Sequence, residues 1–405
     1  MNVAISIIGL GLLILIHEAG HFFVARAVGM NPRKFYIGFP PALAKRTRNG
    51  IEYGIGTIPL GGYVKIPGMH RPAAGDLDIH FGRAVAEEPS LTSPVEELRR
   101  RLEHEDHTGG RQAVAELQAK LEVSELSPGA VKAAERGVTE IDDALGPDAY
   151  WRAQTWKRVA VIFAGPGANL LLAVVLFAGL FLATSGAYRL GFVLGADDQG
   201  AATRLVEEVV DDTPAATSGL RAGDRIVAID GRPVAVDEIR DTISGSAGRP
   251  LTLTVQRDGG PIQIGPVRPE QTGDYAFGES LWQAVRVTGL VSKEIGATVG
   301  RLVTGEGREE ISSPVGIVQG SSQAADRGAE DYLWVLGLIS LSLALLNLLP
   351  LLPLDGGHIA FSLIEGLRGK AVAREVYERV SVVGIAVVLL LFFIGLSNDI
   401  GRLGS

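Results

Sequence analysis

The sequence predicts a multi-pass α-helical membrane protein with four transmembrane helices and folded insertions between them. Hydrophobic residues make up 46% of the 405 residues, whereas charged residues make up only 21%. The apolar residues gather in four long blocks instead of being spread along the chain. Each block approaches or exceeds the roughly 20 residues that an α-helix needs to cross a bilayer.

The first block ends in the motif HEAGH, and the helix that it predicts spans residues 1–28. A secretory signal would begin with basic residues and end in a small-residue cleavage site, which this block lacks, so we interpret it as a retained helix. The other three blocks predict helices over residues 158–185, 332–362 and 379–398.

Basic residues near the helix ends predict the orientation, because the cytoplasmic loops of membrane proteins carry an excess of Lys and Arg. Such residues follow the first helix, precede the second, and lie between the third and fourth. These positions share one side of the membrane if the N-terminus lies outside. We therefore expect a protein of the inner (plasma) membrane, embedded in the lipid bilayer, with both termini and the region between the second and third helices extracytoplasmic.

The predicted cytoplasmic loop has two parts. Residues 29–75 are rich in Gly, Ile and Tyr and contain the turn pair Asn49-Gly50, which predicts a β-hairpin or small sheet. Residues 76–150 are polar and rich in Ala, Glu and Arg, which predicts a charged helical insert that is broken at Ser127-Pro128-Gly129. A solvated spacer accounts for this composition, and a docking module for a partner is the alternative.

The external region also has two parts. The phrase VVDDTPAATSGLRAGDRIVAIDGRPV resembles a PDZ domain, which we expect over residues 200–270. Residues 278–331 are predicted to form an amphipathic helix and a linker. The apolar residues of this helix recur at spacings of about three and four, which favours a position on the membrane surface. Packing of the same helix against the PDZ domain is the alternative.

Composition excludes several classes of site and partner. The chain has no cysteine, so it forms no disulfide and any metal ion must be held by His, Asp or Glu. The net charge is −8, which argues against nucleic acid as a partner because nucleic-acid binding requires a basic surface.

The motif His17-Glu18-Ala19-Gly20-His21 is the strongest chemical signal in the sequence. On a helix the two histidines are one turn apart and share a face, so both imidazoles can reach one metal ion, and Glu18 lies beside them. The motif occurs by chance in roughly one chain in a hundred of this length. Ionisable groups inside an apolar helix are costly and are rarely kept without a role, so we predict a metal site.

A catalytic zinc ion usually takes three protein ligands and leaves a fourth position for water. Asp355 is the only acidic residue in the third apolar block, which makes it the candidate third ligand. A cap of the helix end, or a pair with a basic residue, is the other interpretation of this aspartate. Two neutral imidazoles and one carboxylate suit Zn²⁺.

Three motifs together resemble the site-2 protease family of intramembrane zinc metalloproteases. They are HEAGH in the first helix, AGPGAN in the second and NLLPLLPLDGG in the third. The resemblance is to the bacterial RseP-like type with one PDZ domain, and it covers nearly the whole chain in order. The insert at residues 76–150 is longer and more charged than the family pattern, so the resemblance assigns it no role.

The resemblance implies roles for individual residues. His17, His21 and Asp355 match the zinc ligands of the family, and Glu18 matches its catalytic acid/base. The element G-P-x-x-N in the second helix is interpreted as close packing and a local kink beside the active-site helices.

Asn347 and Pro350 match the family element N-x-x-P, which resembles a stretch that binds substrate. Packing between helices is the other interpretation of the Asn347 amide. His358, close to Asp355 in the sequence, is expected to have a structural or supporting role.

The function that the resemblance implies is zinc endopeptidase activity on transmembrane segments. Substrates would be single-span membrane proteins such as anti-sigma factors, cleaved in regulated intramembrane proteolysis after a first extracytoplasmic cut. The alternative is a membrane-anchored PDZ scaffold with a structural zinc site. Glu18 favours the enzyme, because a structural site closes its fourth position with a ligand and needs no glutamate beside the first histidine.

Overall fold

The computed structural model describes residues 2–196, 202–271, 273, 275–308 and 311–403. Residues 200–201 of the predicted PDZ domain and residues 309–310 of the predicted linker lie outside the described residues. The chain divides into two compact units. We call residues 14–167 and 347–381 the hairpin unit, and residues 1–13, 168–346 and 382–405 the sheet unit.

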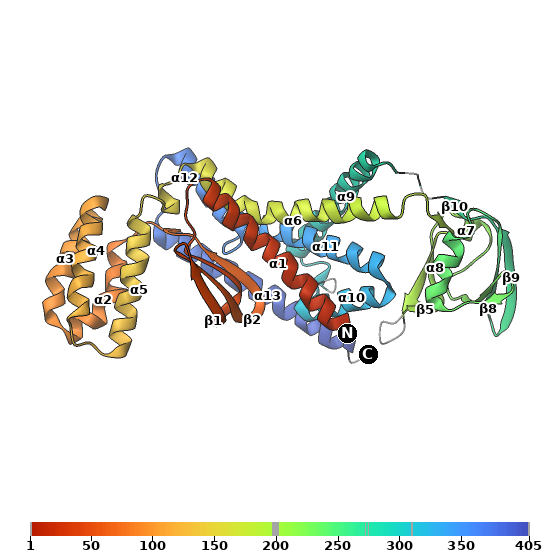
Figure 1. Ribbon diagram of the computed structural model, residues 1–405, viewed down its shortest axis with the longest axis horizontal. Helices are drawn as coiled ribbons and strands as arrows, with labels where there is room; N and C mark the ends of the chain where they lie inside the picture. Colours follow the sequence, from red (N-terminus) through yellow and green to blue (C-terminus); the bar gives the residue numbers. More distant parts are fainter. Residues whose placement is uncertain (1, 197–201, 272, 274, 309–310, 404–405) are drawn as a thin grey trace. The chain divides into compact units, whose positions relative to one another are not determined.

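Four helices of the described residues are long and apolar enough to cross a membrane. They are α1 (Asn2–Ala27), α6 (Thr155–Ala183), α11 (Ala329–Asn347) and α13 (Arg374–Leu403), which Figure 1 traces. The predicted helices at residues 1–28, 158–185 and 379–398 therefore correspond to α1, α6 and α13 within a few residues.

The prediction of one helix over residues 332–362 is wrong, because this block divides into two helices. The chain leaves the helix after Asn347, runs through a turn of seven residues, and begins α12 (Asp355–Arg368). Pro350 and Pro353 lie in this turn. Each proline lacks an N–H and its ring clashes with the preceding turn of a helix, which is why the apolar block divides here.

Two glycines allow the turn to fold against the start of α12. A Cβ atom on Gly356 would lie 2.2 Å from the carbonyl oxygen of Leu348, and one on Gly357 would lie 2.6 Å from the backbone nitrogen of Leu352. Since no side chain fits at either position, the sequence Asp355-Gly356-Gly357 fixes how the turn meets the first residues of α12.

A long two-stranded antiparallel hairpin follows α1. Strands β1 (Lys34–Arg48) and β2 (Ile51–Lys65) are joined by Asn49 and Gly50, whose φ angles are 51° and 76°. The tight two-residue turn that requires positive φ at both positions favours Asn-Gly, as the sequence predicts. Residues 34–37 also pair with residues 62–65, so the end of β2 forms an outer edge.

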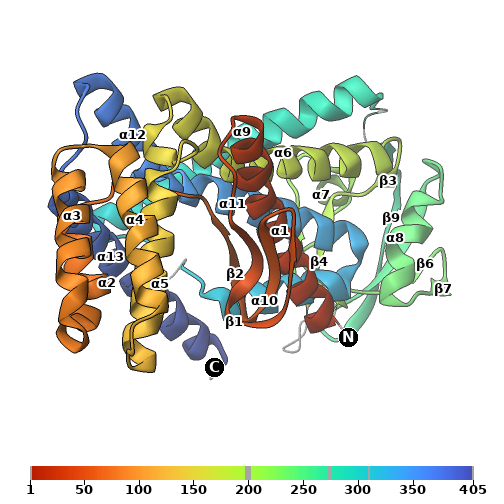
Figure 2. The same cartoon turned by 60° about the vertical axis from the view of Figure 1, so that its left-hand side comes forward.

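The charged insert folds as a helical bundle with a core of its own, shown in orange to yellow in Figure 2. Its helices are α2 (Ala74–Glu87), α3 (Thr92–Glu103), α4 (His107–Glu122) and α5 (Pro128–Leu145), with a short 3₁₀ turn at Pro89–Leu91. Its buried side chains include Leu77, Phe81, Leu98, Leu117 and Leu145. This core distinguishes the insert from the solvated spacer that its composition favours.

The sheet unit contains a six-stranded antiparallel sheet and two helices around a second core. The elements are β4 (Phe192–Ala196), β5 (Ala202–Val209), α7 (Pro214–Thr217), β6 (Arg225–Ile229), β7 (Arg232–Pro233), α8 (Val236–Ser244), β8 (Leu251–Arg257) and β9 (Gly260–Val267). The strand order is β4-β5-β6-β8-β9, and β7 pairs with β6. Strands β3 (Tyr188–Arg189) and β10 (Glu270–Gln271) pair where the chain enters and leaves this domain.

Two helices follow the sheet. The long helix α9 (Phe277–Thr304) packs Ala284 against Phe177 of α6 and Leu341 of α11, so one of its faces is covered by apolar helices instead of lying free on a membrane surface. Helix α10 (Pro314–Arg327) occupies the predicted linker and was not expected from the sequence. Its first turn is capped by Asp399 of α13, which accepts hydrogen bonds from the backbone N–H (2.8 Å) and hydroxyl (2.6 Å) of Ser313.

Candidate metal centre

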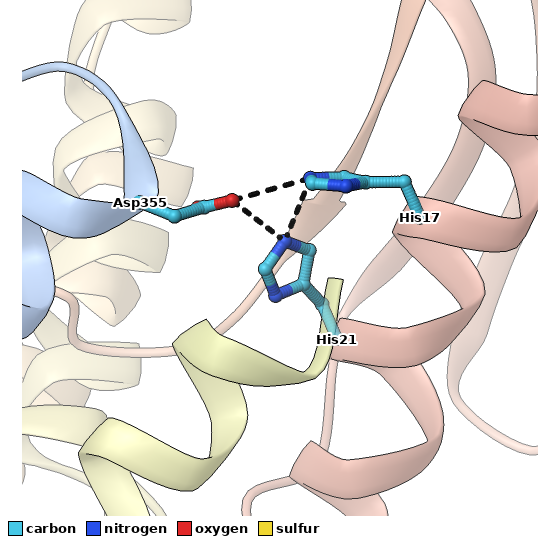
Figure 3. Close-up of side chains that lie close together, drawn as sticks. All are labelled: His17, His21 and Asp355. Carbon is cyan, nitrogen blue, oxygen red and sulfur yellow. Dashed lines mark hydrogen bonds and ion pairs between the residues drawn. The ribbon is translucent and has the colours of Figure 1, made fainter. Parts of the chain in front are cut away.

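Helix α1 places His17 and His21 on one face, as the spacing of four residues requires. Their Nε2 atoms lie 3.2 Å apart, and the rings meet edge to face with centroids 4.8 Å apart. Both side chains are largely shielded from solvent. The two nitrogens therefore point at one position instead of at separate partners (Figure 3).

Asp355 reaches the same position from the first turn of α12. Its Oδ2 atom lies 3.2 Å from Nε2 of His17 and 3.5 Å from Nε2 of His21 (Figure 3). The residue is 334 positions further along the chain than His21, so the turn at residues 348–354 is what brings it here. The structure thus brings together the three residues that the sequence singles out as ligands, and they could hold one metal ion.

The three ligand atoms fit zinc. A tetrahedral zinc ion bound at about 2.0–2.1 Å requires ligand atoms roughly 3.4 Å apart. The observed separations are 3.2, 3.2 and 3.5 Å. Two imidazole nitrogens and one carboxylate oxygen are also donors that zinc accepts, and among the described residues no fourth such group joins them.

A backbone carbonyl sets the tautomer of His21. The Nδ1 atom of His21 lies 2.8 Å from the carbonyl oxygen of Val161 in α6. A carbonyl oxygen only accepts, so Nδ1 carries the proton and Nε2 keeps its lone pair. Metal-binding histidines commonly donate the other ring N–H in this way, which fixes the ring and increases the basicity of the ligand nitrogen.

Gly165, in the AGPGAN motif of α6, leaves room for the His21 ring. A Cβ atom on Gly165 would lie 2.3 Å from Nε2 of His21, which is the atom that points at Asp355. Together with the Val161 carbonyl, this close approach makes one turn of α6 the support of the His21 imidazole.

Glu18 lies half-buried between the histidines in sequence and against the end of β2 in space. The backbone N–H of Val64 donates a hydrogen bond to its carboxylate. A Cβ atom on Gly62 would lie 2.9 Å from Cγ of Glu18. The outer edge of the hairpin therefore borders the carboxylate that the motif assigns to proton transfer.

An ion-pair network stiffens the hairpin that carries this edge. Glu52 of β2 accepts a hydrogen bond from the Tyr36 hydroxyl (2.7 Å) and lies 3.0 Å from the ammonium group of Lys34. The hydrogen bond from Tyr36 and then the Lys34 ammonium lower the pKa of Glu52 to about 2. Burial and then the Glu52 carboxylate raise the pKa of Tyr36 to about 12. At neutral pH this network is therefore fully formed and ties β1 to β2.

The structure places the other predicted residues close to the site without giving them a chemical role. Asn347 ends α11 and is half-buried, and Pro350 is exposed in the turn before Asp355. Their contact with substrate stays a prediction. His358, one turn after Asp355, hydrogen-bonds to the hydroxyl of Tyr377 in α13.

Sequence reasoning missed three parts of the site. The Val161 carbonyl is a backbone group and leaves no signal in the sequence. Val64 is an ordinary strand residue, and its contact with Glu18 depends on tertiary structure. Gly62 could have been found, because a glycine inside a strand pattern often marks a close approach of another chain segment.

Comparison with known proteins agrees with this geometry. Residues 5–391 match Peptidase family M50. The chain is 30% identical over 459 residues to the regulator of sigma-E protease RseP of Salmonella typhimurium, covering 99% of each chain. It is 30% identical over 427 residues to a protein of Agrobacterium fabrum whose name describes a zinc metalloprotease, covering 98% of this chain and 95% of the relative. It is 27% identical over 429 residues to the protease Eep of Enterococcus faecalis, covering 98% of each.

Proposed function

This chain belongs to peptidase family M50, and from that premise we propose that it hydrolyses peptide bonds within the membrane-spanning segments of other proteins. As a member of the family it is a membrane-embedded zinc metalloprotease of the site-2 protease type. The proposal concerns the residues that carry out the reaction, the substrates, and the orientation in the membrane.

One observation carries the proposal: three ligand atoms converge beside a carboxylate at the boundary of apolar helices. His17, His21 and Asp355 would hold the zinc ion, since their Nε2, Nε2 and Oδ2 atoms lie within 3.5 Å of one another. With three ligands from the protein, a fourth position is left for water or substrate, which is the pattern of catalytic zinc sites.

A zinc ion held there supplies Lewis-acid chemistry, which activates water as a nucleophile and polarises the scissile carbonyl. The Glu18 carboxylate accepts the proton of the attacking water and passes it to the nitrogen of the departing amide. The hydrogen bond from Val64 orients this carboxylate.

The outer edge of β2 holds the substrate in an extended form. Alternate residues of an antiparallel strand direct their backbone groups to the same side. Because the Val64 N–H points toward Glu18, the backbone groups of Gly62 face the same way. A substrate helix must unwind before its amides are accessible, and its unpaired backbone groups then find partners along this edge. We also assign substrate contact to Asn347 and Pro350, because they match the family element N-x-x-P.

We call the six-stranded sheet with helices α7 and α8 the sheet domain. We further propose an inner-membrane location in which both termini and the sheet domain are extracytoplasmic, whereas the hairpin and the insert are cytoplasmic. The sheet domain is a PDZ domain that restricts access to substrates already trimmed outside the membrane. The substrates are single-span membrane proteins that regulate transcription factors, such as anti-sigma factors. Support for this substrate class comes from RseP, a relative named as a regulator of sigma-E.

The test of the proposed function is Glu18→Gln in the full chain, assayed on a purified single-span reporter. We expect full zinc content and a loss of at least about 10²-fold in cleavage, since glutamine keeps the shape but cannot take a proton. Glu125→Gln, on the insert, is the matched control and should cleave normally. A membrane-anchored scaffold with a structural zinc site would show no cleavage by the native chain. If cleavage falls only a few-fold, Glu18 is not the principal group that transfers the proton.

A further inference from the structure

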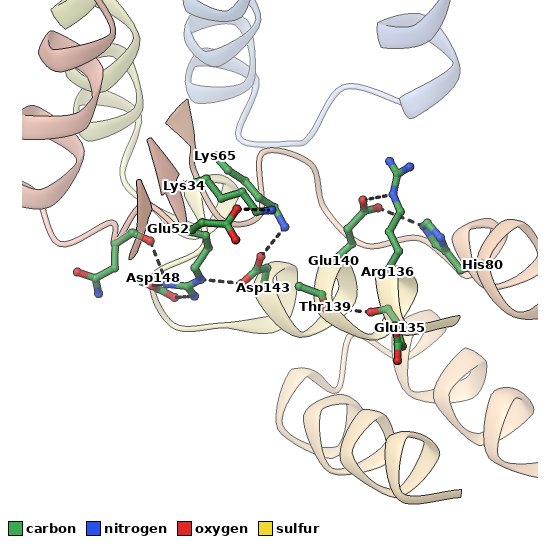
Figure 4. Close-up of polar contacts among 12 residues, drawn as sticks. Lys34, Glu52, Lys65, His80, Glu135, Arg136, Thr139, Glu140, Asp143 and Asp148 are labelled. Atoms are coloured by element: carbon green, nitrogen blue, oxygen red, sulfur yellow. Dashed lines mark hydrogen bonds and ion pairs between the residues drawn. The ribbon is translucent and has the colours of Figure 1, made fainter. Parts of the chain in front are cut away.

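Ion pairs fix the helical insert to the hairpin, at Lys65 of β2 and at Arg33 just before β1. Asp143 of α5, only 8% exposed, accepts from Nε of Arg33 (2.7 Å) and lies 3.0 Å from Nζ of Lys65. Figure 4 shows the Lys65 and Asp143 side chains pointing toward each other. Asp148 adds a second carboxylate, 2.9 Å from Nη1 of Arg33. Ion pairs on a shielded carboxylate are costly to break, so α5 holds a defined position beside β2.

Helices α2 and α5 of the insert are in turn held against each other. A Cβ atom on Gly137 of α5 would lie 2.4 Å from Cβ of His80 in α2, so the two helices touch at this point. Glu140 of α5 joins them further, with one oxygen 2.7 Å from Nε of Arg136 and the other 3.3 Å from Nε2 of His80 (Figure 4). The two helices therefore form a rigid wall.

A groove of about 570 Å³ lies between this wall and the hairpin. Residues 63–65 of β2 and the following loop form one side, and Ile79, Arg136 and Glu140 belong to the other. The volume falls within the range of ligand-binding pockets, about 300–1,000 Å³. Val64 lines the groove and its N–H also donates to Glu18, so the groove borders the stretch of β2 that lies beside this carboxylate.

Ile79 is an apolar side chain on the outer face of α2. It is 70% exposed, whereas Leu77 and Phe81 on either side are buried in the bundle core. Single exposed apolar residues are common and carry no meaning by themselves. Ile79, however, faces a groove that continues the substrate-binding edge, where an apolar wall would contact a bound chain.

We propose that this groove binds the segment of the substrate that leaves the membrane on the side of the insert, in an extended conformation. The inference rests on the proposed function and adds a site for substrate selection. A strand added at Gly62 and Val64 advances about 3.3 Å per residue and passes Lys65 within a few residues. Its backbone continues past the end of β2 into the groove, and one of its aliphatic side chains packs on Ile79. The insert is thereby a specificity module of the protease.

Disulfide crosslinking tests the placement, because the chain has no native cysteine. Ile79→Cys is introduced in the full chain carrying Glu18→Gln, and the single-span reporter carries one cysteine at successive positions beyond the scissile bond. We expect crosslinks at a short window of these positions. Val123→Cys is the matched control, since Val123 is 83% exposed on the insert and does not line the groove. Equal crosslinking by both variants would overturn the inference.

Cleavage kinetics provide a second test, in variants that keep Glu18 and are otherwise native. Ile79→Trp narrows the groove, so KM for the reporter should rise about tenfold, the scale of one buried aliphatic side chain, with kcat unchanged. Val123→Trp should change neither constant. A reporter truncated at the membrane boundary should be cleaved equally by all three proteins. An unchanged KM for Ile79→Trp would refute the groove while the native activity still stood. Failure of the native chain to cleave either reporter would refute the proposed function itself.

Discussion

Gly165 of α6 packs directly against His21 of α1, at the nitrogen that points toward Asp355. A side chain on Gly165 would bring its Cβ atom to 2.3 Å from Nε2 of His21, a distance that real Cβ atoms do not reach. The Val161 carbonyl, one turn earlier in α6, holds the other nitrogen of the same ring at 2.8 Å. The AGPGAN motif therefore acts on the candidate metal site through the orientation of one imidazole.

This contact predicts that Gly165→Ala displaces the His21 ring. Zinc affinity and cleavage should fall by about 10- to 100-fold, the range seen when a group supporting a metal ligand is lost. Gly179→Ala is the matched control, because Gly179 lies in the same helix with no atom within 4 Å of the added Cβ. Zinc titration and cleavage assays on both variants decide the matter. Normal zinc affinity in Gly165→Ala would show that α6 does not support the ligand.

The ligand set predicts one zinc ion per chain. Metal analysis of the purified protein should give about one equivalent, and His21→Ala or Asp355→Ala should lower the occupancy because each leaves only two ligands. His104→Ala provides the control, since His104 is exposed on the insert and its Nδ1 atom hydrogen-bonds to the backbone oxygen of Arg100. Full occupancy in both ligand variants would exclude this set.

The part of the site that depends on local sequence could be predicted, and the part that depends on long-range packing could not. His17 and His21 share a helix face by spacing alone, and the Asn49-Gly50 turn follows from backbone preference. Asp355 could be singled out only because it is the one acid in its apolar block. The Val64 and Val161 backbone contacts arise from tertiary structure, and no side-chain pattern encodes them.

In the fold, too, features with a local cause could be predicted more readily than features that depend on long-range packing. The break before Asp355 has a local cause in Pro350 and Pro353, yet the block is apolar throughout and therefore resembles one span. The N-terminal cap of helix α10 depends on Asp399, which lies 86 residues beyond Ser313 and accepts hydrogen bonds from it. The composition of the insert predicts charged helices, but only the assembled bundle shows that four helices bury a common core.

The distribution of basic residues predicts the topology, and the absence of native cysteine makes labelling clean. Ala222→Cys lies at an exposed position in the sheet domain, and Val123→Cys lies at one on the insert. In intact cells a membrane-impermeant maleimide should label Ala222→Cys, and it should label Val123→Cys only after the membrane is opened. The reverse pattern would invert the topology, and with it the assignment of the insert to the cytoplasm.

The sheet domain is attached to the rest of its unit by contacts that allow it to be removed. Its two chain ends meet where Arg189 of β3 pairs with Glu270 of β10. Arg240 of α8 lies 2.9 Å from Glu330 at the start of α11, but both side chains are exposed. Exposed ion pairs of this kind contribute little, typically 0–1 kcal/mol. The domain can therefore be excised without removing a contact on which the helices depend.

Replacing residues 190–269 with an Asn-Gly linker should close a two-residue turn between β3 and β10. If the domain restricts access by its bulk, this deletion variant should cleave untrimmed substrates that the native chain leaves intact. Its zinc content and its activity on trimmed substrate should be unchanged, because the ligands and Glu18 lie in the hairpin unit. Cleavage of a matched pair of reporters, with and without a folded external domain, measures the effect.

A domain that instead recruits substrate by adding it as a strand would give the opposite result. The deletion variant would then cleave the trimmed reporter more slowly while its zinc stays bound. That result would contradict the proposal that the domain restricts access by its bulk.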